Sequence, residues 1–198
     1  MKCKLVTLLL IFIGQQLYGQ TKIATINGVV KNILFSYAYL HDADSNVTKV
    51  CPITDGRFQL YVKIEKELKL FNLFLASDSL TKNQIESRIK DRSSIRMVAL
   101  ADMQVTVVDR IETAEISGGE LNKALDEMNI SIVNLNYENY FDKYPDSVVS
   151  IYFLKLLAKV SKMPMLSSPI NLRSYYTKLS DRIKNSDEGK MLYTTIFK

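Results

Sequence analysis

The chain has 198 residues, of which 47% are hydrophobic and 24% charged, and its formal net charge is +5. It contains two cysteines, one histidine and no tryptophan, which excludes a zinc finger because such a site needs four thiolate or imidazole ligands. The cysteines stand at positions 3 and 51, so a CxxC redox motif is excluded as well. No serine-hydrolase elbow or glycine-rich phosphate loop is present, and we expect a protein without enzymatic activity, cofactor or metal.

The N-terminus has the three-part pattern of a secretory signal peptide. Met1 to Lys4 is basic, Leu5 to Ile13 is apolar apart from one threonine, and a short polar stretch ends at the small residue Gly19. A membrane-spanning helix needs roughly 20 apolar residues, which is about twice the length of this run. The pattern therefore predicts a signal peptide over residues 1–19.

Cleavage near Gly19 predicts an exported, soluble product in the periplasm or cell envelope. The segment Leu17 to Gln20 is similar to a bacterial lipobox, but glutamine stands where the lipidated cysteine would be, so no lipid anchor is expected. Loss of Lys2 and Lys4 lowers the net charge from +5 to +3. Nucleic-acid binding requires clustered lysine and arginine rather than this mild excess, and we expect none. Cys51 becomes the only thiol, so no internal disulfide can form.

Residues 21–116 show mostly period-two hydrophobicity, which predicts strands. Asp55-Gly56 predicts a hairpin turn, and the strand that follows, Arg57 to Lys63, alternates cleanly enough to indicate a sheet with one solvated face. Leu68 to Ala76 is apolar on both faces and is expected to be a central strand. Residues 77–94 are polar and predict an exposed loop or a short helix. Further strands are expected at 95–101, 104–108 and 111–116, giving an antiparallel β-sandwich or open barrel over residues 20–117.

After Ser117 the apolar residues recur at helical spacing. Ser117-Gly118-Gly119-Glu120 has the spacing of a capping box. Asp146-Ser147 and Ser186 are predicted to cap two later helices, and Ser168-Pro169 to open another. The sequence thus predicts an α+β fold in which a helical array over residues 118–198 packs on the β-sandwich.

Four short motifs, in order, resemble a known domain. They are Thr54 to Phe58, Ala114 to Gly118 with Leu121-Asn122, Tyr140 to Ser147, and Ile183 to Lys190. Their order and spacing resemble the domain of unknown function, family 4369, that precedes the thioredoxin domain in exported TlpA/ResA-like thiol-disulfide oxidoreductases of Gram-negative bacteria. The resemblance implies an accessory module that lacks the redox domain. No catalytic residue can be carried over, because the Trp-Cys-x-x-Cys motif is absent.

Cys51 and His41 are candidates for redox chemistry and metal binding, respectively. Cys51 is a candidate redox thiol that could form a mixed disulfide with a separate thioredoxin-like oxidoreductase, but a lone cysteine on a strand is more often a small buried apolar residue. His41 precedes Asp42 and Asp44 and could join them in binding a divalent cation. The favoured interpretation is that it begins a solvated turn.

Tyrosine is abundant, with 11 residues, and offers rigid amphipathic contact area. Tyr37, Tyr39 and Tyr61 lie on predicted strands and are candidates for a binding surface. The alternative is that they lie at the rim of the core. The preferred function is an exported, non-enzymatic module that binds an envelope protein or a small ligand, and the alternative is a redox accessory protein acting through Cys51.

Overall fold

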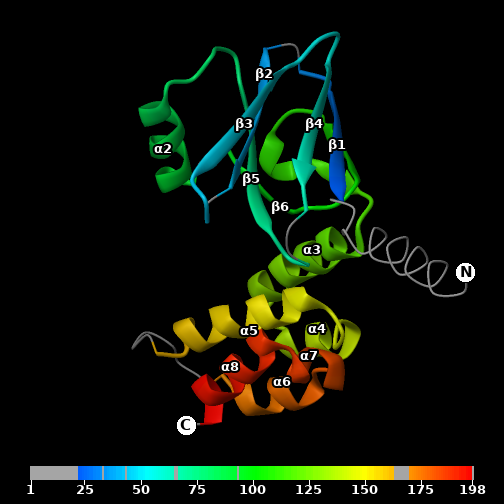
Figure 1. The fold of residues 1–198 in the computed structure, drawn as a ribbon, viewed down its shortest axis with the longest axis vertical. Helices are drawn as coiled ribbons and strands as arrows, with labels where there is room; N and C mark the ends of the chain where they lie inside the picture. The colour runs from blue at the N-terminus through cyan, green and yellow to red at the C-terminus, as the bar shows by residue number, and fades with distance from the viewer. Residues whose placement is uncertain are drawn as a thin grey trace, which may run out of the picture.

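The computed structural model describes residues 22–32, 34–42, 44–64, 67–92, 94–162 and 170–197. Among them, eight strands form two four-stranded sheets, and helices follow in the C-terminal part of the chain. The two parts are stacked along the long axis of the molecule (Figure 1). The predicted α+β fold is therefore confirmed. The predicted signal peptide over residues 1–19 and the Ser168-Pro169 helix start lie outside the described residues.

Sheet A contains one parallel pair of strands. It consists of β4 (Arg57–Lys63), β1 (Ile23–Val30), β7 (Met103–Val107) and β8 (Glu115–Ser117), hydrogen-bonded in that order. β1 pairs antiparallel with β4 but parallel with β7. The predicted antiparallel sandwich thus includes one parallel pair, because the chain crosses from sheet B directly into β7 and delivers it in the direction of β1.

Sheet B is antiparallel throughout and is covered on its outer face. It consists of β3 (Val47–Pro52), β2 (Tyr37–Asp42), β5 (Leu70–Ala76) and β6 (Arg96–Ala99), in that order. β5 is central, as predicted, with Leu73 buried between the sheets and Phe74 buried on the other face. That outer face packs against helix α2 (Lys82–Asp91), which forms within the predicted loop or short helix at 77–94.

The Asp55-Gly56 turn links the two sheets instead of joining a hairpin. Asp55 and Gly56 have positive φ of 51° and 68°, and the Thr54 and Arg57 backbones exchange two hydrogen bonds of 2.9 Å. The N–H of Val30 also donates to the carbonyl oxygen of Gly56 at 2.7 Å, which draws the turn onto β1. The turn was therefore predicted correctly, but β3 and β4 belong to different sheets.

Two predicted boundaries near Ser117 are wrong. The strand expected at 111–116 is a 3₁₀ turn, η1 (Ile111–Thr113), followed by the short β8. The capping box does not form, because the N-cap of the next helix is Gly119, with φ of 79°, and Ser117 remains in β8. The later caps hold: Ser147 accepts a hydrogen bond from the Val149 N–H at 3.3 Å, and Ser186 accepts one from the Gly189 N–H at 3.0 Å.

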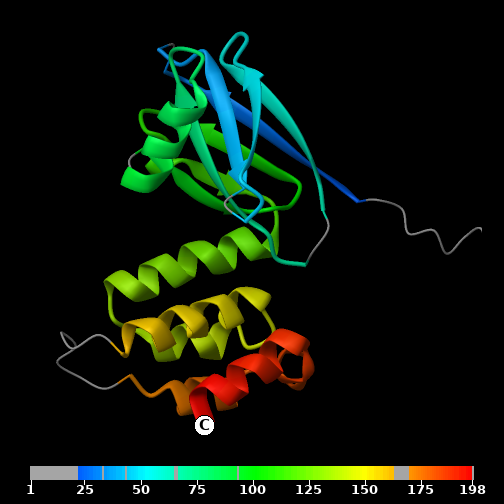
Figure 2. The same cartoon turned by 60° about the vertical axis from the view of Figure 1, so that its left-hand side comes forward.

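The helices form a separate layered array with its own aromatic core. They are α3 (Glu120–Val133), α4 (Tyr137–Lys143), α5 (Val148–Val160), α6 (Leu172–Lys178), α7 (Asp181–Asn185) and α8 (Asp187–Phe197). Figure 2 shows α3 as the layer between the sandwich and the other helices. Phe141 stacks on Phe153 at a ring-centroid distance of 5.4 Å, and Tyr140 meets Phe153 edge-on at 4.9 Å.

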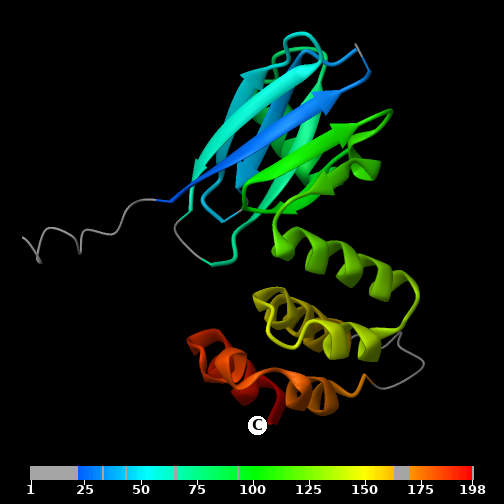
Figure 3. The ribbon, with the colours of Figure 1, turned by 90° about the vertical axis from the view of Figure 1, so that its right-hand side faces the viewer.

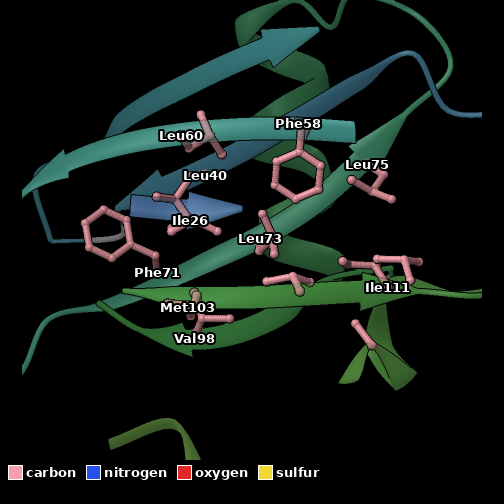
Figure 4. Packing of buried hydrophobic residues seen from close by; sticks show 14 of the residues in the cluster. Ile26, Leu40, Phe58, Leu60, Phe71, Leu73, Leu75, Val98, Met103 and Ile111 are labelled. Carbon is pink, nitrogen blue, oxygen red and sulfur yellow. The ribbon is translucent and has the colours of Figure 1, made fainter. Parts of the chain in front are cut away.

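The sandwich core lies between the two sheets and ends against η1. Ile26, Phe58 and Met103 of sheet A belong to the same buried cluster as Leu40 and Leu73 of sheet B (Figure 4). Because alternate residues of each sheet A strand enter this core, the intervening residues must point outward. These outward-facing side chains of sheet A form the candidate site.

The sandwich and the helices meet at a buried asparagine. Asn122 of α3 accepts a hydrogen bond from the Ala99 N–H at 2.8 Å and donates one to the Ala99 carbonyl oxygen at 2.9 Å. These two bonds satisfy backbone groups at the edge of β6 that would otherwise be unpaired. One side chain thereby substitutes for a neighbouring strand.

Candidate functional site: the open face of sheet A

Sheet A presents an outer face that none of the described helices covers. The side chains on this face alternate with the buried ones, and we call them together the open face: Ile23, Thr25, Asn27, Val29, Arg57, Gln59, Tyr61, Lys63, Gln104, Thr106, Glu115 and Ser117. Figure 3 shows β1, β4 and β7 with no helix in front of them. By contrast, α2 packs on the outer face of sheet B. The solvated sheet face predicted from the β4 pattern is therefore present.

One row of the open face carries hydrogen-bonding side chains on all four strands. Strand register aligns Gln59 with Asn27, Asn27 with Gln104, and Gln104 with Ser117. Neighbouring strands in a sheet lie about 4.8 Å apart, so these groups recur at that interval across the sheet. We call this set the polar row.

The polar row is continued by a tyrosine whose ring is accessible. The Gln59 Nε2 donates to the Asn27 Oδ1 at 2.6 Å, and the Tyr61 hydroxyl donates to the Gln59 Oε1. Tyr61 is nevertheless 54% exposed. Hydrogen bonds thus hold both the amides and the ring in place while one side of the ring faces solvent.

The Asn27-Gly28 pair lies in the middle of a central strand, where both residue types are disfavoured. Gly28 has a packing reason: it faces Phe58 across the strand pair, and a Cβ at this position would lie 1.9 Å from the Phe58 ring. Asn27 points to the opposite face, and no core contact requires it. Its contact is the polar row, so asparagine at this position is explained by the open face and not by packing.

Charged residues flank the polar row but are absent from it. The neighbouring row runs from Arg57 through Val29 and Thr106 to Glu115, which places one cation and one anion at opposite edges of the sheet. The centre of the open face is therefore neutral. Recognition there would depend on hydrogen bonds and ring contact instead of ion pairing.

The three tyrosines predicted to form one binding surface lie on two different sheets. Tyr37 and Tyr39 lie on the outer face of sheet B, where Tyr39 is 2% exposed and stacks on Phe74 at a centroid distance of 5.0 Å. The Tyr39 hydroxyl also accepts a hydrogen bond from the Leu80 N–H at 2.8 Å. Only Tyr61 is on the open face. The residues that accompany it, Asn27, Gln104 and Ser117, were not predicted to share a surface, because they are far apart along the chain.

Cys51 lies on β3 at the edge of sheet B and is half-buried against the sandwich core. Burial raises the pKa of its thiol, and a hydrogen bond from the Gln59 backbone opposes that rise only in part. A nucleophilic cysteine has a lowered pKa and an accessible sulfur. The environment of Cys51 is instead that of a small apolar residue.

His41 and Asp42 are buried at the end of β2, so the interpretation as a solvated turn is wrong. The His41 Nδ1 lies 2.9 Å from the Thr48 Oγ1, and burial lowers the pKa of the imidazole. Asp42 forms an ion pair with Lys69 at 2.7 Å and accepts hydrogen bonds from Ser45 and a following backbone N–H. The turn begins only after Asp42, whose side chain organises it. No cluster of three metal-ligating side chains occurs in the described parts of the chain.

A cleft of about 330 Å³ lies beside α3 where β8 ends. Three acidic side chains line it, Glu120, Asp126 and Glu127, and two of them form ion pairs: Asp126 with Arg96, and Glu127 with Lys143. Burial raises the pKa of Asp126 despite the nearby guanidinium. These two ion pairs hold α3 to β6 and α4, and the open face, with aligned hydrogen-bonding groups on four strands, is the stronger candidate.

The chain was compared with known proteins at three levels. No family model, no curated protein and no solved structure matches it. The resemblance to the family 4369 domain stays a prediction. Among the residues described, no helix has the length and apolar character needed to cross a membrane.

Proposed function

We propose that this protein is an exported, non-enzymatic binding module and that it recognises its ligand through the open face. The observation that carries the proposal is the polar row: four neutral hydrogen-bonding side chains, aligned across four strands, on the uncovered face of sheet A. Export rests on the signal peptide predicted for residues 1–19.

A photo-crosslinking experiment tests whether the open face contacts a ligand in the cell. Benzoylphenylalanine replaces Tyr61 on the open face or, as a matched control, Val50 on β3, since both side chains are 54% exposed. We expect a discrete adduct from position 61 that is absent from position 50, and that disappears when Asn27→Arg is added to the first variant. Identical adducts from both positions, or none from position 61, would overturn the proposal.

The alternative function, a redox accessory protein that reacts with a thioredoxin-like enzyme, can be tested on Cys51 itself. Because burial raises the pKa of the thiol, alkylation by iodoacetamide at pH 7.5 is expected to be at least about tenfold slower in the folded protein than in urea. Mass spectrometry over time gives both rates. Equal rates in the two states would restore the redox alternative.

A further inference from the structure

The geometry points to an uncharged, hydroxyl-rich ligand of the carbohydrate class as the occupant of the open face, an inference that rests on the proposed binding function. Carboxamide and hydroxyl side chains each donate and accept hydrogen bonds. Sugar hydroxyls do the same, whereas a charged ligand would require fixed opposite charges. The polar row consists of such two-way groups only.

The spacing of the row suits a ligand with a repeating unit. Gln59, Asn27, Gln104 and Ser117 recur at about the 4.8 Å interval between strands, which is comparable to the width of one sugar ring. An extended saccharide lying across the strands would meet one hydrogen-bonding side chain per unit. The row is straight because strand register, not loop conformation, aligns it.

Tyr61 supplies the second element of carbohydrate recognition, a flat ring next to the hydrogen-bonding groups. Its hydroxyl donates to Gln59, and Gln59 in turn donates to Asn27. The ring is thus held in one orientation before a ligand arrives, which lowers the entropic cost of binding. The exposed side of the ring can stack on the C–H face of a sugar.

The size of the open face argues against a folded protein or a second copy of this chain. From strand spacing and rise per residue, the face measures on the order of 400 Å². A stable protein interface buries about 800 Å² of accessible surface on each partner, so a folded partner would also have to contact side chains outside the open face. A short oligosaccharide needs no more than the open face offers.

The charge pattern narrows the ligand to neutral sugars. Arg57 and Lys63 lie on the edge strand β4 and Glu115 on the opposite edge strand β8, and none of the three lies in the polar row. An acidic polysaccharide would find no line of cations along the row to neutralise it. Uncharged polysaccharides are therefore the probes of choice.

Affinity electrophoresis of the purified protein tests this inference. Native gels run toward the cathode contain dextran, laminarin, xylan or galactomannan, and alginate serves as the charged comparison. We expect retardation by at least one neutral polysaccharide, a loss of at least fivefold in apparent affinity with Tyr61→Ala and with Asn27→Ala, and a smaller loss with Tyr61→Phe, which keeps the ring but removes the hydroxyl that orients it. Tyr193→Ala removes a tyrosine that is 47% exposed on α8 and should leave the retardation unchanged.

The other outcomes separate this inference from the proposed function. If no neutral polysaccharide retards the protein but crosslinking at position 61 captures a protein, the carbohydrate inference is wrong and the proposed function stands. Retardation that persists in Tyr61→Ala and Asn27→Ala, or that occurs with alginate alone, also overturns the inference. Absence of both retardation and a crosslink overturns both.

Discussion

Gly28 and Phe58 form a cross-strand pair in which the aromatic ring occupies the space of a missing side chain. A Cβ at position 28 would lie 1.9 Å from the ring. Gly28→Ala is therefore expected to lower the free energy of unfolding by about 1–3 kcal/mol, the usual cost of overpacking a core. Urea denaturation monitored by circular dichroism measures this change in the free energy of unfolding.

A second substitution shows whether the Phe58 ring is the cause. In a Phe58→Leu background the smaller side chain leaves room, so adding Gly28→Ala should cost clearly less than it does in the wild type. The same cost in both backgrounds would mean that the alanine is disfavoured for another reason, such as a change in the β1 backbone.

Asp42 is expected to make stability depend on acidic pH. Burial by itself raises the pKa of the carboxyl group, but hydrogen bonds from Lys69, Ser45 and the Asp44 backbone outweigh it, so the folded-state pKa is lowered. The resulting stability is present above the ordinary aspartate pKa of about 3.9 and is lost as pH falls through the folded-state value. The wild type should therefore lose stability steeply below about pH 4.

Asp42→Asn separates this effect from general acid sensitivity. The substitution replaces the carboxylate that pairs with the mostly buried Lys69 ammonium by a neutral amide, and should cost about 2–4 kcal/mol at pH 7. Below pH 4 the difference from the wild type should shrink. Urea titrations from pH 2 to pH 7 give both curves, and parallel curves throughout would contradict the role given to Asp42.

At the scale of the element, the start of α3 differs from the start of α5. Two residues with positive φ, Gly118 and Gly119, turn the chain from β8 into α3, which leaves Ser117 too far back to cap the helix. At α5, Ser147 has extended backbone geometry and its side chain accepts a helix N–H. Identical serine-based signals therefore have different structural roles.

Matched alanine substitutions test this difference. Ser147→Ala should destabilise the protein by about 1 kcal/mol, the usual value of a serine N-cap. Ser117→Ala removes a hydroxyl from a solvated strand and should change stability by no more than about 0.5 kcal/mol. Thermal or urea unfolding of the two variants gives the comparison, and an equal loss would indicate that Ser117 caps α3 after all.

At the scale of the whole molecule, Asn122 joins two cores that are otherwise built from different residues. The sandwich core and the helical core form separate buried clusters. Asn122→Leu removes both hydrogen bonds to Ala99 and leaves the backbone groups at the edge of β6 buried without partners, at an expected cost of about 2–4 kcal/mol. Lys123→Ala, one residue along the same helix and exposed, is the control.

Coupling between the two cores can be measured by comparing two unfolding transitions. In the wild type, urea transitions followed by tyrosine fluorescence and by far-ultraviolet circular dichroism should coincide. In Asn122→Leu the helical array and the sandwich should unfold in separate transitions, so that the two signals give different midpoints. Coincident transitions in the variant would show that Asn122 contributes stability without coupling.

The fold class and most elements could be predicted from the sequence, because they follow from local periodicity. The alternation in β4 and the two apolar faces of β5 are visible within seven residues each. The helical spacing after Ser117 and the serine cap of α5 are equally local. Where two glycines or a 3₁₀ turn broke the pattern, between 111 and 120, local signals were misread.

Which strands share a sheet, and which side chains share a face, depends on long-range packing and became known from the three-dimensional structure. Packing of α2 on the outer face of sheet B buried Tyr39, and His41 is buried on the same strand, although their neighbours suggested a binding surface and a polar turn. Strand pairing aligned Asn27 and Gln59 with Gln104 on a strand that is distant in sequence. Register between distant strands depends on how both sheets pack around one core, and no local pattern contains that information.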